Sequence, residues 1–284
     1  MKISDMTLGD LPGFPAITLG TMAIPAQETV AAVHRAIDLG YRSFDTAPIY
    51  GNEAEVGEAI RTASIDRADL FVTTKLWNSC HGFDEALAAF DRTMGRMQLD
   101  VVDLYLMHWP VPRLDRFVDT WKAMVRLKDE GRVRAIGVSN FLPEHLERII
   151  DATGITPAVN QIELHPSFQQ AALRDHHRRC GILTQAWSPL GHGGDLNDPV
   201  IADIARAHDR VPAQVILRWL VQTGVAPVVK ASSAGHMAQN LAVDDFVLAD
   251  DDVAAIAQLD RNESCFGVDP RTFVAPEGME DFHP

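Results

Sequence analysis

The stretch ETVAAVHRAIDLGYRSFDTA, residues 28–47, joins two patterns whose order decides the fold. Val30, Val33 and Ile37 lie three and four residues apart, so they share one face of a helix, and Gly40 stands at its C′ position. The run YRSFDTA follows at once and has the character of a buried strand. A helix ended by glycine and followed by a buried strand is the repeating unit of an α/β protein.

Strands of this kind occur eight times along the chain. The runs are PAITLG, YRSFDTA, LFVTTKLW, VVDLYLMHW, VRAIGVSN, PAVNQIEL, GILTQAWS and GVAPVVKAS. Most are apolar throughout, as expected of parallel strands that are covered on both faces. Further helical patterns occupy residues 119–131, 142–154 and 208–224, and each ends in glycine.

Eight strands that alternate with helices predict an α/β protein of the (β/α)8 barrel type, formed by one domain over residues 1–284. Such a barrel needs roughly 250 residues, which this length supplies. An open doubly wound sheet is the alternative. That fold would more often carry G-x-G-x-x-G after its first strand, and none follows PAITLG.

Composition excludes several classes of partner. The formal net charge of −14 disfavours binding to nucleic acid or to an anionic membrane. No run of about 18 apolar residues predicts a membrane span, and MKISDMTLGDLPG lacks the apolar core of a signal peptide. Cys80, Cys180 and Cys265 are far apart, which suits a reducing cytoplasm and gives no zinc spacing. We therefore expect a cytoplasmic protein without a bound metal.

Polar side chains fall where the predicted strands end. In a barrel the C-terminal ends of the strands form the active-site face, so these residues should converge on one mouth. They are Asp45, Lys75, His108, Ser139, Asn140, Gln161, Glu163, Trp187, Ser188 and Lys230, with Tyr50 in the loop after Asp45.

Four of these residues suggest a specific chemistry. Tyr50 alone is a weak acid, but an ammonium group such as that of Lys75 within about 4–6 Å lowers the pKa of a phenol. Asp45 would keep Lys75 charged, and His108 would donate a hydrogen bond to the oxygen that Tyr50 protonates. The group therefore acts as a general acid toward a carbonyl oxygen. A hydride is still needed, and only a cofactor can supply it.

The chain resembles the aldo-keto reductase family over nearly its full length. The matching stretches are GYRSFDTAPIYGNEAEVG, TTKLWN, DLYLMHWP, IGVSNF, NQIELHP, QAWSPL and DPRTF. The pattern is most similar to bacterial members of the 2,5-diketo-gluconate reductase type. The resemblance implies NADPH-dependent reduction of small carbonyls, dicarbonyls or sugar-derived ketones by a monomer. It assigns Tyr50 as proton donor, Lys75 and Asp45 as its support, and His108 as the residue that orients the carbonyl.

The resemblance also assigns binding residues. Ser139, Asn140 and Gln161 would hold the nicotinamide carboxamide, and Trp187 would stack on its ring, where many members have tyrosine. The predicted cofactor set is Thr21, Met22, Ser139, Asn140, Gln161, Trp187, Ser188, Leu190, Gly191, Lys230, Ala231, Ser232, Ser233, His236, Gln239 and Asn240. The predicted substrate set is Ile49, Trp77, His108, Trp109 and Phe273, in a pocket left open by a short loop after the fourth strand.

The segment VVKASSAGHMAQN, residues 228–240, departs from the family pattern PKSxRxxRxxEN. Ser233 and His236 stand where the family has arginines that grip the 2′-phosphate of NADPH. Arginine offers a planar, permanently charged fork to a phosphate, and histidine does not. Because Lys230 and Ser232 remain available, we predict NADPH as the cofactor, with a weakened preference that lets NADH be accepted.

Two other functions fit parts of the pattern. Lys75 could form a Schiff base, as in barrel aldolases, but only if no carboxylate pairs with it. The family also includes non-enzymatic subunits that bind the cofactor and regulate channels.

Glu163 and His165 in the ELHP stretch are expected to be structural rather than catalytic.

Overall fold

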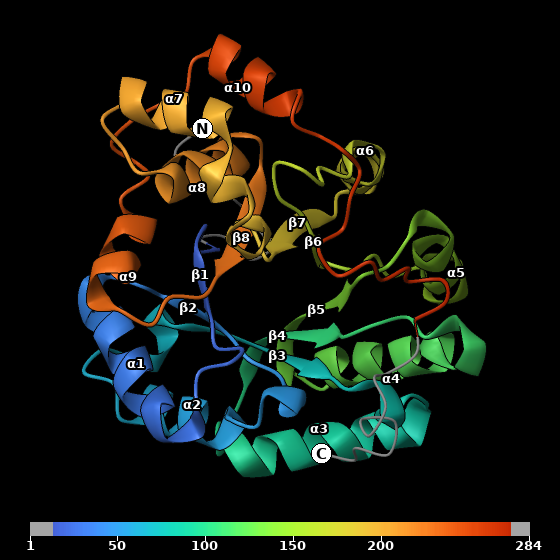
Figure 1. The fold of residues 1–284 in the computed structure, drawn as a ribbon. Helices are drawn as coiled ribbons and strands as arrows, with labels where there is room; N and C mark the ends of the chain where they lie inside the picture. The colour runs from blue at the N-terminus through green and yellow to red at the C-terminus, as the bar shows by residue number, and fades with distance from the viewer. Residues whose placement is uncertain (1–13, 274–284) are drawn as a thin grey trace.

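Eight parallel strands close on themselves in the computed structural model, which describes residues 14–273 (Figure 1). Each strand pairs with the next along the chain, and the last pairs with the first. This topology confirms the predicted barrel and excludes the open sheet. The strands are β1 (Thr18–Gly20), β2 (Ser43–Asp45), β3 (Phe71–Leu76), β4 (Val102–Met107), β5 (Val133–Ser139), β6 (Val159–Glu163), β7 (Leu183–Trp187) and β8 (Val225–Val229).

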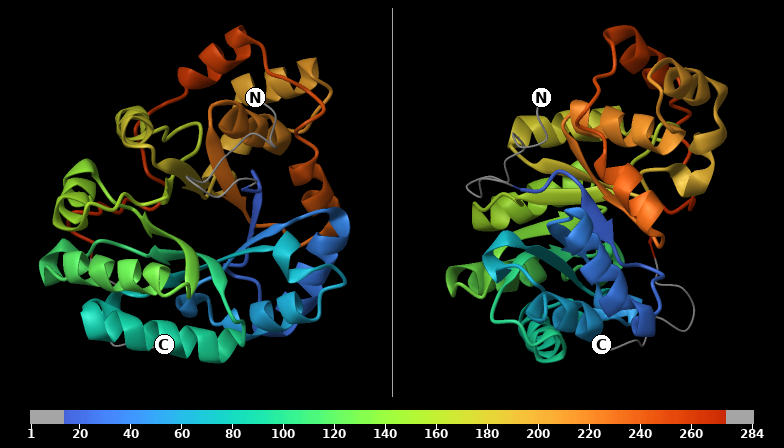
Figure 2. Two further views of the ribbon diagram at one scale, coloured as in Figure 1. Left: turned by 180° about the vertical axis from the view of Figure 1, so that it is seen from behind. Right: turned by 90° about the vertical axis from the view of Figure 1, so that its left-hand side faces the viewer.

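Helices surround the barrel on its outside (Figures 1 and 2). Two of them, rather than one, connect β7 to β8, so the predicted helix over 208–224 is shorter than its pattern and is preceded by an additional helix. The helices are α1 (Ala26–Leu39), α2 (Glu53–Arg61), α3 (Phe83–Met97), α4 (Phe117–Asp129), α5 (Pro143–Thr153), α6 (Ala171–Cys180), α7 (Pro199–Ala207), α8 (Pro212–Gln222), α9 (Ala234–Leu241) and α10 (Asp250–Ala257).

The opening stretch forms the helix and strand that its pattern predicts. Val33 and Ile37 are buried on the inner face of α1. Gly40 adopts a left-handed conformation with φ of 109°, and its N–H and that of Tyr41 bond to the last carbonyls of the helix. A side chain at this position would strain the turn, so glycine sets where α1 ends and how soon β2 begins.

The strands are buried almost throughout, and their apolar side chains pack against the inner faces of the helices. Polar residues inside this layer, Lys75 among them, are therefore costly unless they are paired. Within residues 14–273, no helix is long and apolar enough to cross a membrane.

A glycine brings α2 into direct contact with the end of α3. A Cβ atom at Gly57 would lie 2.1 Å from the carbonyl oxygen of Met97, whereas one at the exposed Gly95 of α3 would meet nothing within 4 Å. We expect Gly57→Ala to lower the free energy of unfolding by about 2–3 kcal/mol through overpacking. Gly95→Ala should raise it by about 0.5–1 kcal/mol, because alanine is the better helix former. Urea unfolding of both variants checks the contrast, which equal effects would contradict.

Candidate active site

The register of the strands brings the four predicted catalytic residues together. Asp45 ends β2 and pairs with Thr73, two residues before Lys75 on the neighbouring β3. A single 3₁₀ turn, Pro48–Tyr50, follows β2 and ends on Tyr50. His108 comes directly after β4. All four residues therefore come from the C-terminal ends of three adjacent strands and the turn between two of them.

Lys75 lies at the centre of this group. Its ammonium donates hydrogen bonds to the Asp45 carboxylate, to the Thr46 carbonyl at 3.1 Å and to the Tyr50 hydroxyl at 3.3 Å. The side chains of Lys75 and Asp45 are 1% and 3% exposed. Asp45 and Tyr50 are thus both positioned by one buried cation, and the carboxylate pairing removes the lysine that a Schiff-base enzyme would need.

Burial and charge act on these groups in opposite directions. Burial raises the pKa of Tyr50, and the Lys75 ammonium, which lowers it, offsets this only in part. Lys75 thus lowers the pKa of Tyr50 as predicted, but the larger effect of burial, which was not predicted, raises it overall. Burial lowers the pKa of Lys75, but Asp45 and Tyr50 outweigh burial and raise it. Tyr50 therefore keeps its proton at neutral pH, and Lys75 keeps its charge.

His108 lies beside the tyrosine in an apolar setting. Its ring lies edge-on to that of Tyr50, at 6.2 Å between centroids, and to that of Trp77, at 5.2 Å. Burial, assisted by the Lys75 charge, holds the pKa of His108 well below its usual range. The imidazole is therefore neutral and has one N–H to donate. Its buried Nδ1 has no hydrogen-bond partner among residues 14–273.

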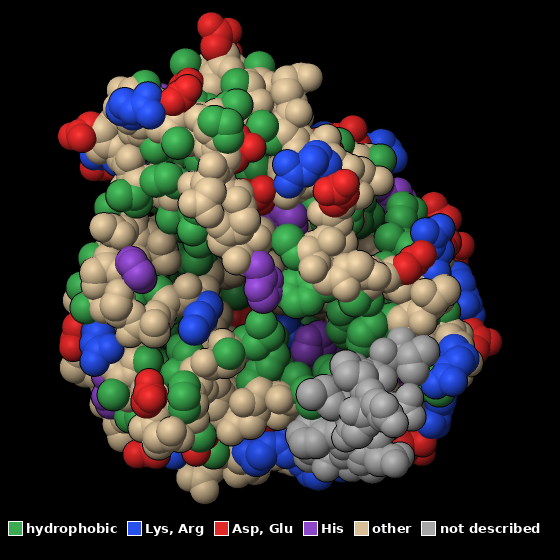
Figure 3. All heavy atoms as spheres, in the orientation of Figure 1, with side chains coloured by type: hydrophobic (Ala, Val, Ile, Leu, Met, Phe, Trp, Pro, Cys, Tyr) green, Lys and Arg blue, Asp and Glu red, His purple; other side chains and the backbone are tan. Residues whose placement is uncertain are grey.

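These residues line a cavity of about 360 Å³ at the barrel mouth. Figure 3 shows hydrophobic side chains, with histidine among them, around the hollow in the middle of this face. The lining residues are Gly20, Met22, Asp45, Ile49, Tyr50, Trp77, His108, Trp109, Ser139, Asn140, Gln161, Trp187, Ser188, Pro189, Val228, Lys230, Phe266, Val268 and Phe273. Every residue of the predicted substrate set is among them, and Phe273 stacks on Trp109 at 4.0 Å between ring centroids.

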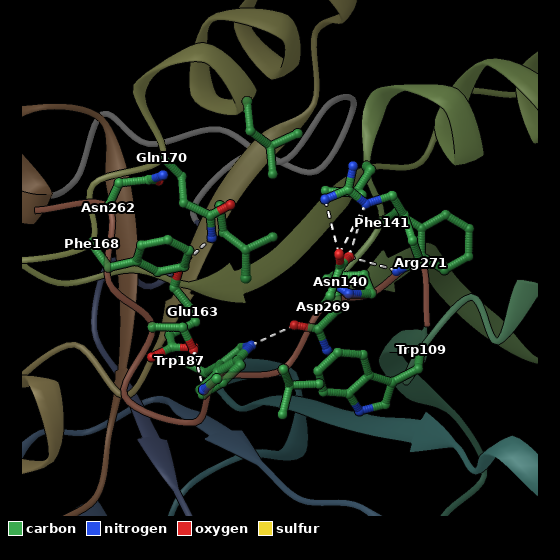
Figure 4. Close-up of a pocket in the computed structure, with 17 residues that line it drawn as sticks. Trp109, Asn140, Phe141, Glu163, Phe168, Gln170, Trp187, Asn262, Asp269 and Arg271 are labelled. Carbon is green, nitrogen blue, oxygen red and sulfur yellow. Dashed lines mark hydrogen bonds and ion pairs between the residues drawn. The ribbon is translucent and has the colours of Figure 1, made fainter. Parts of the chain in front are cut away.

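A chain of hydrogen bonds fixes the polar wall opposite the tyrosine. The Trp187 indole N–H donates to the side-chain oxygen of Asn140 at 2.9 Å, as Figure 4 shows. The Asn140 amide donates in turn to Ser139 and to the His108 carbonyl, both at 3.0 Å. Asn140 adopts a left-handed backbone with φ of 63°, a conformation that asparagine tolerates better than most residues. The tryptophan is thereby held in one orientation at the cavity wall.

Gln161 connects this wall to the catalytic group. Its amide nitrogen donates to the second carboxylate oxygen of Asp45 at 2.9 Å and to Gln185 at 2.8 Å. Both amide hydrogens are thus used within the protein. Only the side-chain oxygen of Gln161 is left to accept a hydrogen bond from a ligand.

Part of the predicted cofactor set lies away from the cavity wall. Thr21 is fully buried and donates to the Asp45 carbonyl, and Asn240 is buried against Tyr41. Ser232, Ser233, His236 and Gln239, in the turn after β8 and in α9, are exposed like Lys230. The predicted cofactor residues that do not line the cavity are Thr21, Leu190, Gly191, Ala231, Ser232, Ser233, His236, Gln239 and Asn240.

Several residues of the cavity wall were not predicted from the sequence. Phe266 and Val268 belong to the C-terminal loop, whose path no pattern predicts. The Phe266 ring lies 5.2 Å from that of Trp187 and 4.6 Å from that of His192. Gly20 and Val228 also line the cavity, and the signal for them was their position next to predicted residues at strand ends.

Sequence reasoning also missed a cation near the turn after β8. Arg35 on α1 reaches the Ser232 carbonyl at 3.5 Å. It adds a second positive side chain to a region where only Lys230 was expected.

A barrel whose mouth holds this lysine-centred group beside an apolar cavity is the arrangement of an oxidoreductase that acts on carbonyl groups. Comparison with known proteins agrees. The chain belongs to the Aldo/keto reductase family, whose model matches residues 16–197 and 195–261.

Named relatives and a solved structure show the same likeness. Morphine 6-dehydrogenase of Pseudomonas putida is 48% identical over 90% of this chain and 91% of its own. Methylglyoxal reductase DkgA of Salmonella typhimurium is 44% identical over 91% of this chain and 94% of its own. A solved structure is that of a Gox0644 mutant in complex with NADPH. Its chain shares 49% sequence identity with this chain, and the two superpose with a TM-score of 0.87 over 90% of this chain and 93% of the Gox0644 chain. The predicted resemblance is confirmed.

Proposed function

We propose that this protein reduces aldehydes and ketones to alcohols with NADPH, using Tyr50 as the proton donor. The observation that carries the proposal is the Lys75 ammonium, buried between the Asp45 carboxylate and the Tyr50 hydroxyl at the base of the cavity. His108, neutral and next to Tyr50, would donate a hydrogen bond to the carbonyl oxygen and orient it. Lys75 would stabilise the phenolate that remains once the proton has left.

The cavity wall fits a nicotinamide. Trp187 is fixed by Asn140 and offers an aromatic surface, while Ser139, Asn140 and the Gln161 oxygen supply polar partners for a carboxamide. The solved relative with bound NADPH supports the same choice of cofactor. When bound, the cofactor would supply the hydride that no side chain can provide.

The walls indicate a broad substrate class. Ile49, Trp77, Trp109 and Phe273 surround the catalytic group with apolar surface, so a substrate needs a carbonyl at one end and few further polar contacts. The names of two relatives support tolerance, since one acts on morphine and the other on methylglyoxal. We propose small carbonyls, dicarbonyls and sugar-derived ketones as substrates.

The proposed reaction is tested by following the absorbance of reduced nicotinamide with a dicarbonyl, an aromatic aldehyde, an aldose and a keto-sugar acid. Turnover of at least one carbonyl with NADPH is the expected result. Binding of NADPH without turnover of any of them would instead favour the regulatory subunit. Borohydride trapping of a substrate on Lys75 would favour the Schiff-base enzyme.

The turn after β8 and the start of α9 would receive the adenosine end of the cofactor. Lys230, Ser232 and His236 are exposed there, and Ser233 caps the helix by accepting from the His236 N–H. A helix start with Lys230 before it favours a phosphate, but no arginine occupies the Ser233 or His236 position. We therefore propose NADPH as the preferred cofactor and NADH as an accepted one.

Introducing the arginine of the family pattern at position 236 should increase the preference for NADPH over NADH. We expect His236→Arg to raise the ratio of the dissociation constants for NADH and NADPH by about 10- to 100-fold, because a charge-assisted hydrogen bond contributes about 1.5–3 kcal/mol. Fluorescence titration of both cofactors gives the ratio. Gln258→Arg, directly after α10, is the control, because it adds the same charge at an exposed position outside the cavity wall. A wild-type preference above about a hundredfold, near 2.7 kcal/mol, would contradict the weakened preference.

Domain organisation, oligomeric state and cellular compartment can be proposed from charge and cysteine content. We propose a single-domain monomer that works in the cytoplasm. The strongly negative charge and the three free cysteines support this proposal, because disulfides are rare in reducing compartments. Light scattering at assay concentration is expected to give the mass of one chain.

A further inference from the structure

Three chemically distinct side chains meet between the end of β6 and the C-terminal loop. His165 follows β6, Glu163 ends that strand, and Cys265 lies in the C-terminal loop 100 residues further along the chain. His165 Nε2 lies 3.3 Å from the Cys265 sulfur and 3.2 Å from Glu163 Oε1. All three ligand atoms lie within 4.8 Å of one another. The catalytic group described above uses none of them.

Two of the three ligand separations are close to what a zinc ion requires. Zinc binds imidazole nitrogen at about 2.0–2.1 Å, carboxylate oxygen at about 2.0–2.2 Å and thiolate at about 2.3 Å, in a tetrahedron. Ligand atoms at these bond lengths are separated by roughly 3.3–3.6 Å. The two distances around His165 Nε2 lie within a few tenths of an ångström of that range. The donors are also the nitrogen, sulfur and oxygen types that zinc prefers.

The groups behind the three donors are arranged as in zinc sites. Asp195 Oδ2 lies 2.9 Å from Nδ1 of His165, so the other ring nitrogen, Nε2, is the one that faces Glu163 and Cys265. A carboxylate on the far nitrogen of a histidine ligand is a common feature of protein zinc sites, because it fixes the tautomer and the ring orientation. Ser264 donates to the other oxygen of Glu163 at 2.6 Å.

The three side chains of the cluster differ in their exposure to solvent. Glu163 and His165 are 5% and 0% exposed, whereas Cys265 is exposed and can admit an ion from solvent. Glu163 lines a cavity of about 330 Å³, and Figure 4 shows it beside Trp187 at the wall of that cavity.

We propose that Glu163, His165 and Cys265 form a binding site for zinc or a chemically similar divalent ion. The ion would join the end of β6 to the C-terminal loop. Phe266, next to Cys265, packs on Trp187 and His192, so the ion would hold the loop over the wall that faces the nicotinamide. Gly191 lies against the same cluster, since a Cβ there would be 2.4 Å from Asp195 and 3.2 Å from His165.

Cobalt is the probe, because it occupies zinc sites and a cobalt–thiolate bond gives a charge-transfer absorption in the near ultraviolet. Metal-free full-length protein, kept reduced with a phosphine, is titrated with cobalt chloride. We expect one Co²⁺ per chain, a thiolate band that saturates at one equivalent, and loss of the band when Zn²⁺ is added.

Variants assign the ligands. Cys265→Ser should abolish the thiolate band, and Cys180→Ser, which removes another partly exposed thiol, should leave it intact. Matching near-ultraviolet circular dichroism of the metal-free variants shows that they are folded. His165→Gln is a second ligand variant and should weaken cobalt binding at least tenfold. The absence of a saturable band in the wild type, or a band that survives Cys265→Ser, would overturn the proposal.

Discussion

Tyr50→Phe is expected to lower kcat/KM for carbonyl reduction by about 10²–10⁴-fold, the usual effect of losing a general acid. The variant keeps the ring and its edge-on contact with His108 and loses only the hydroxyl that Lys75 contacts. Cofactor affinity should change little, because the variant leaves Trp187, Asn140 and their hydrogen bond untouched. Steady-state kinetics with the preferred carbonyl, together with cofactor titration, measure both quantities.

A second tyrosine provides the matched control. Tyr41 is fully buried, and its hydroxyl donates to the Met237 carbonyl at 3.2 Å, away from the cavity. Tyr41→Phe should cost about 1 kcal/mol of stability through a lost buried hydrogen bond and leave kcat/KM near that of the wild type. Equal losses of kcat/KM in the two variants would show that the loss follows from removing any buried tyrosine hydroxyl, and would contradict the role of Tyr50 as proton donor.

Lys75→Met is expected to lower the free energy of unfolding by about 3–5 kcal/mol and to reduce activity as strongly as Tyr50→Phe. The methionine fills a similar volume but leaves the Asp45 carboxylate buried without its cation, which is the most costly way to break an ion pair. Tyr50 loses the Lys75 charge, which lowers its pKa, so the phenolate formed on proton transfer would lack this stabilisation. Urea unfolding and steady-state kinetics measure the two effects.

The double variant Asp45→Asn/Lys75→Met separates charge from shape. Removing both charges should recover at least half of the lost stability, because no uncompensated ion remains, while activity stays low. If the double variant is as unstable as the sum of the two single variants, the ion pair is not the source of the loss.

The order of strands and helices could be predicted because it rests on local patterns. Buried parallel strands are apolar throughout, and glycines such as Gly40 mark where helices end. The barrel then places polar residues at strand ends around one mouth, so the convergence of Asp45, Lys75 and His108 could be predicted from the sequence. The additional helix α7 was not predicted, although Asp198 and Pro199 at its start and the buried Ile201, Ile204 and Ala205 form a helical pattern.

The remaining features depend on contacts between distant segments. Phe266 and Val268 reach the cavity through a loop with no repeating pattern, and Cys265 meets His165 across 100 residues, a separation at which no motif indicates a metal site. The direction of the net pKa shift of Tyr50 could not be predicted from the individual residues either. The charge of Lys75 can be read from the sequence, but the larger effect of burial is a property of the closed barrel.

Asp45 accepts one hydrogen bond from Lys75 and another from Gln161. A single carboxylate therefore contacts both the lysine that stabilises the Tyr50 phenolate and the glutamine proposed to bind the nicotinamide carboxamide. Loss of the Tyr50 proton and arrival of the cofactor therefore act on the same group. Thermodynamic linkage makes the effect reciprocal: the factor by which deprotonation changes cofactor affinity equals the factor by which the cofactor changes the acid dissociation constant of Tyr50. The protonation state of the acid can thus be followed, without any substrate, as the pH dependence of cofactor binding.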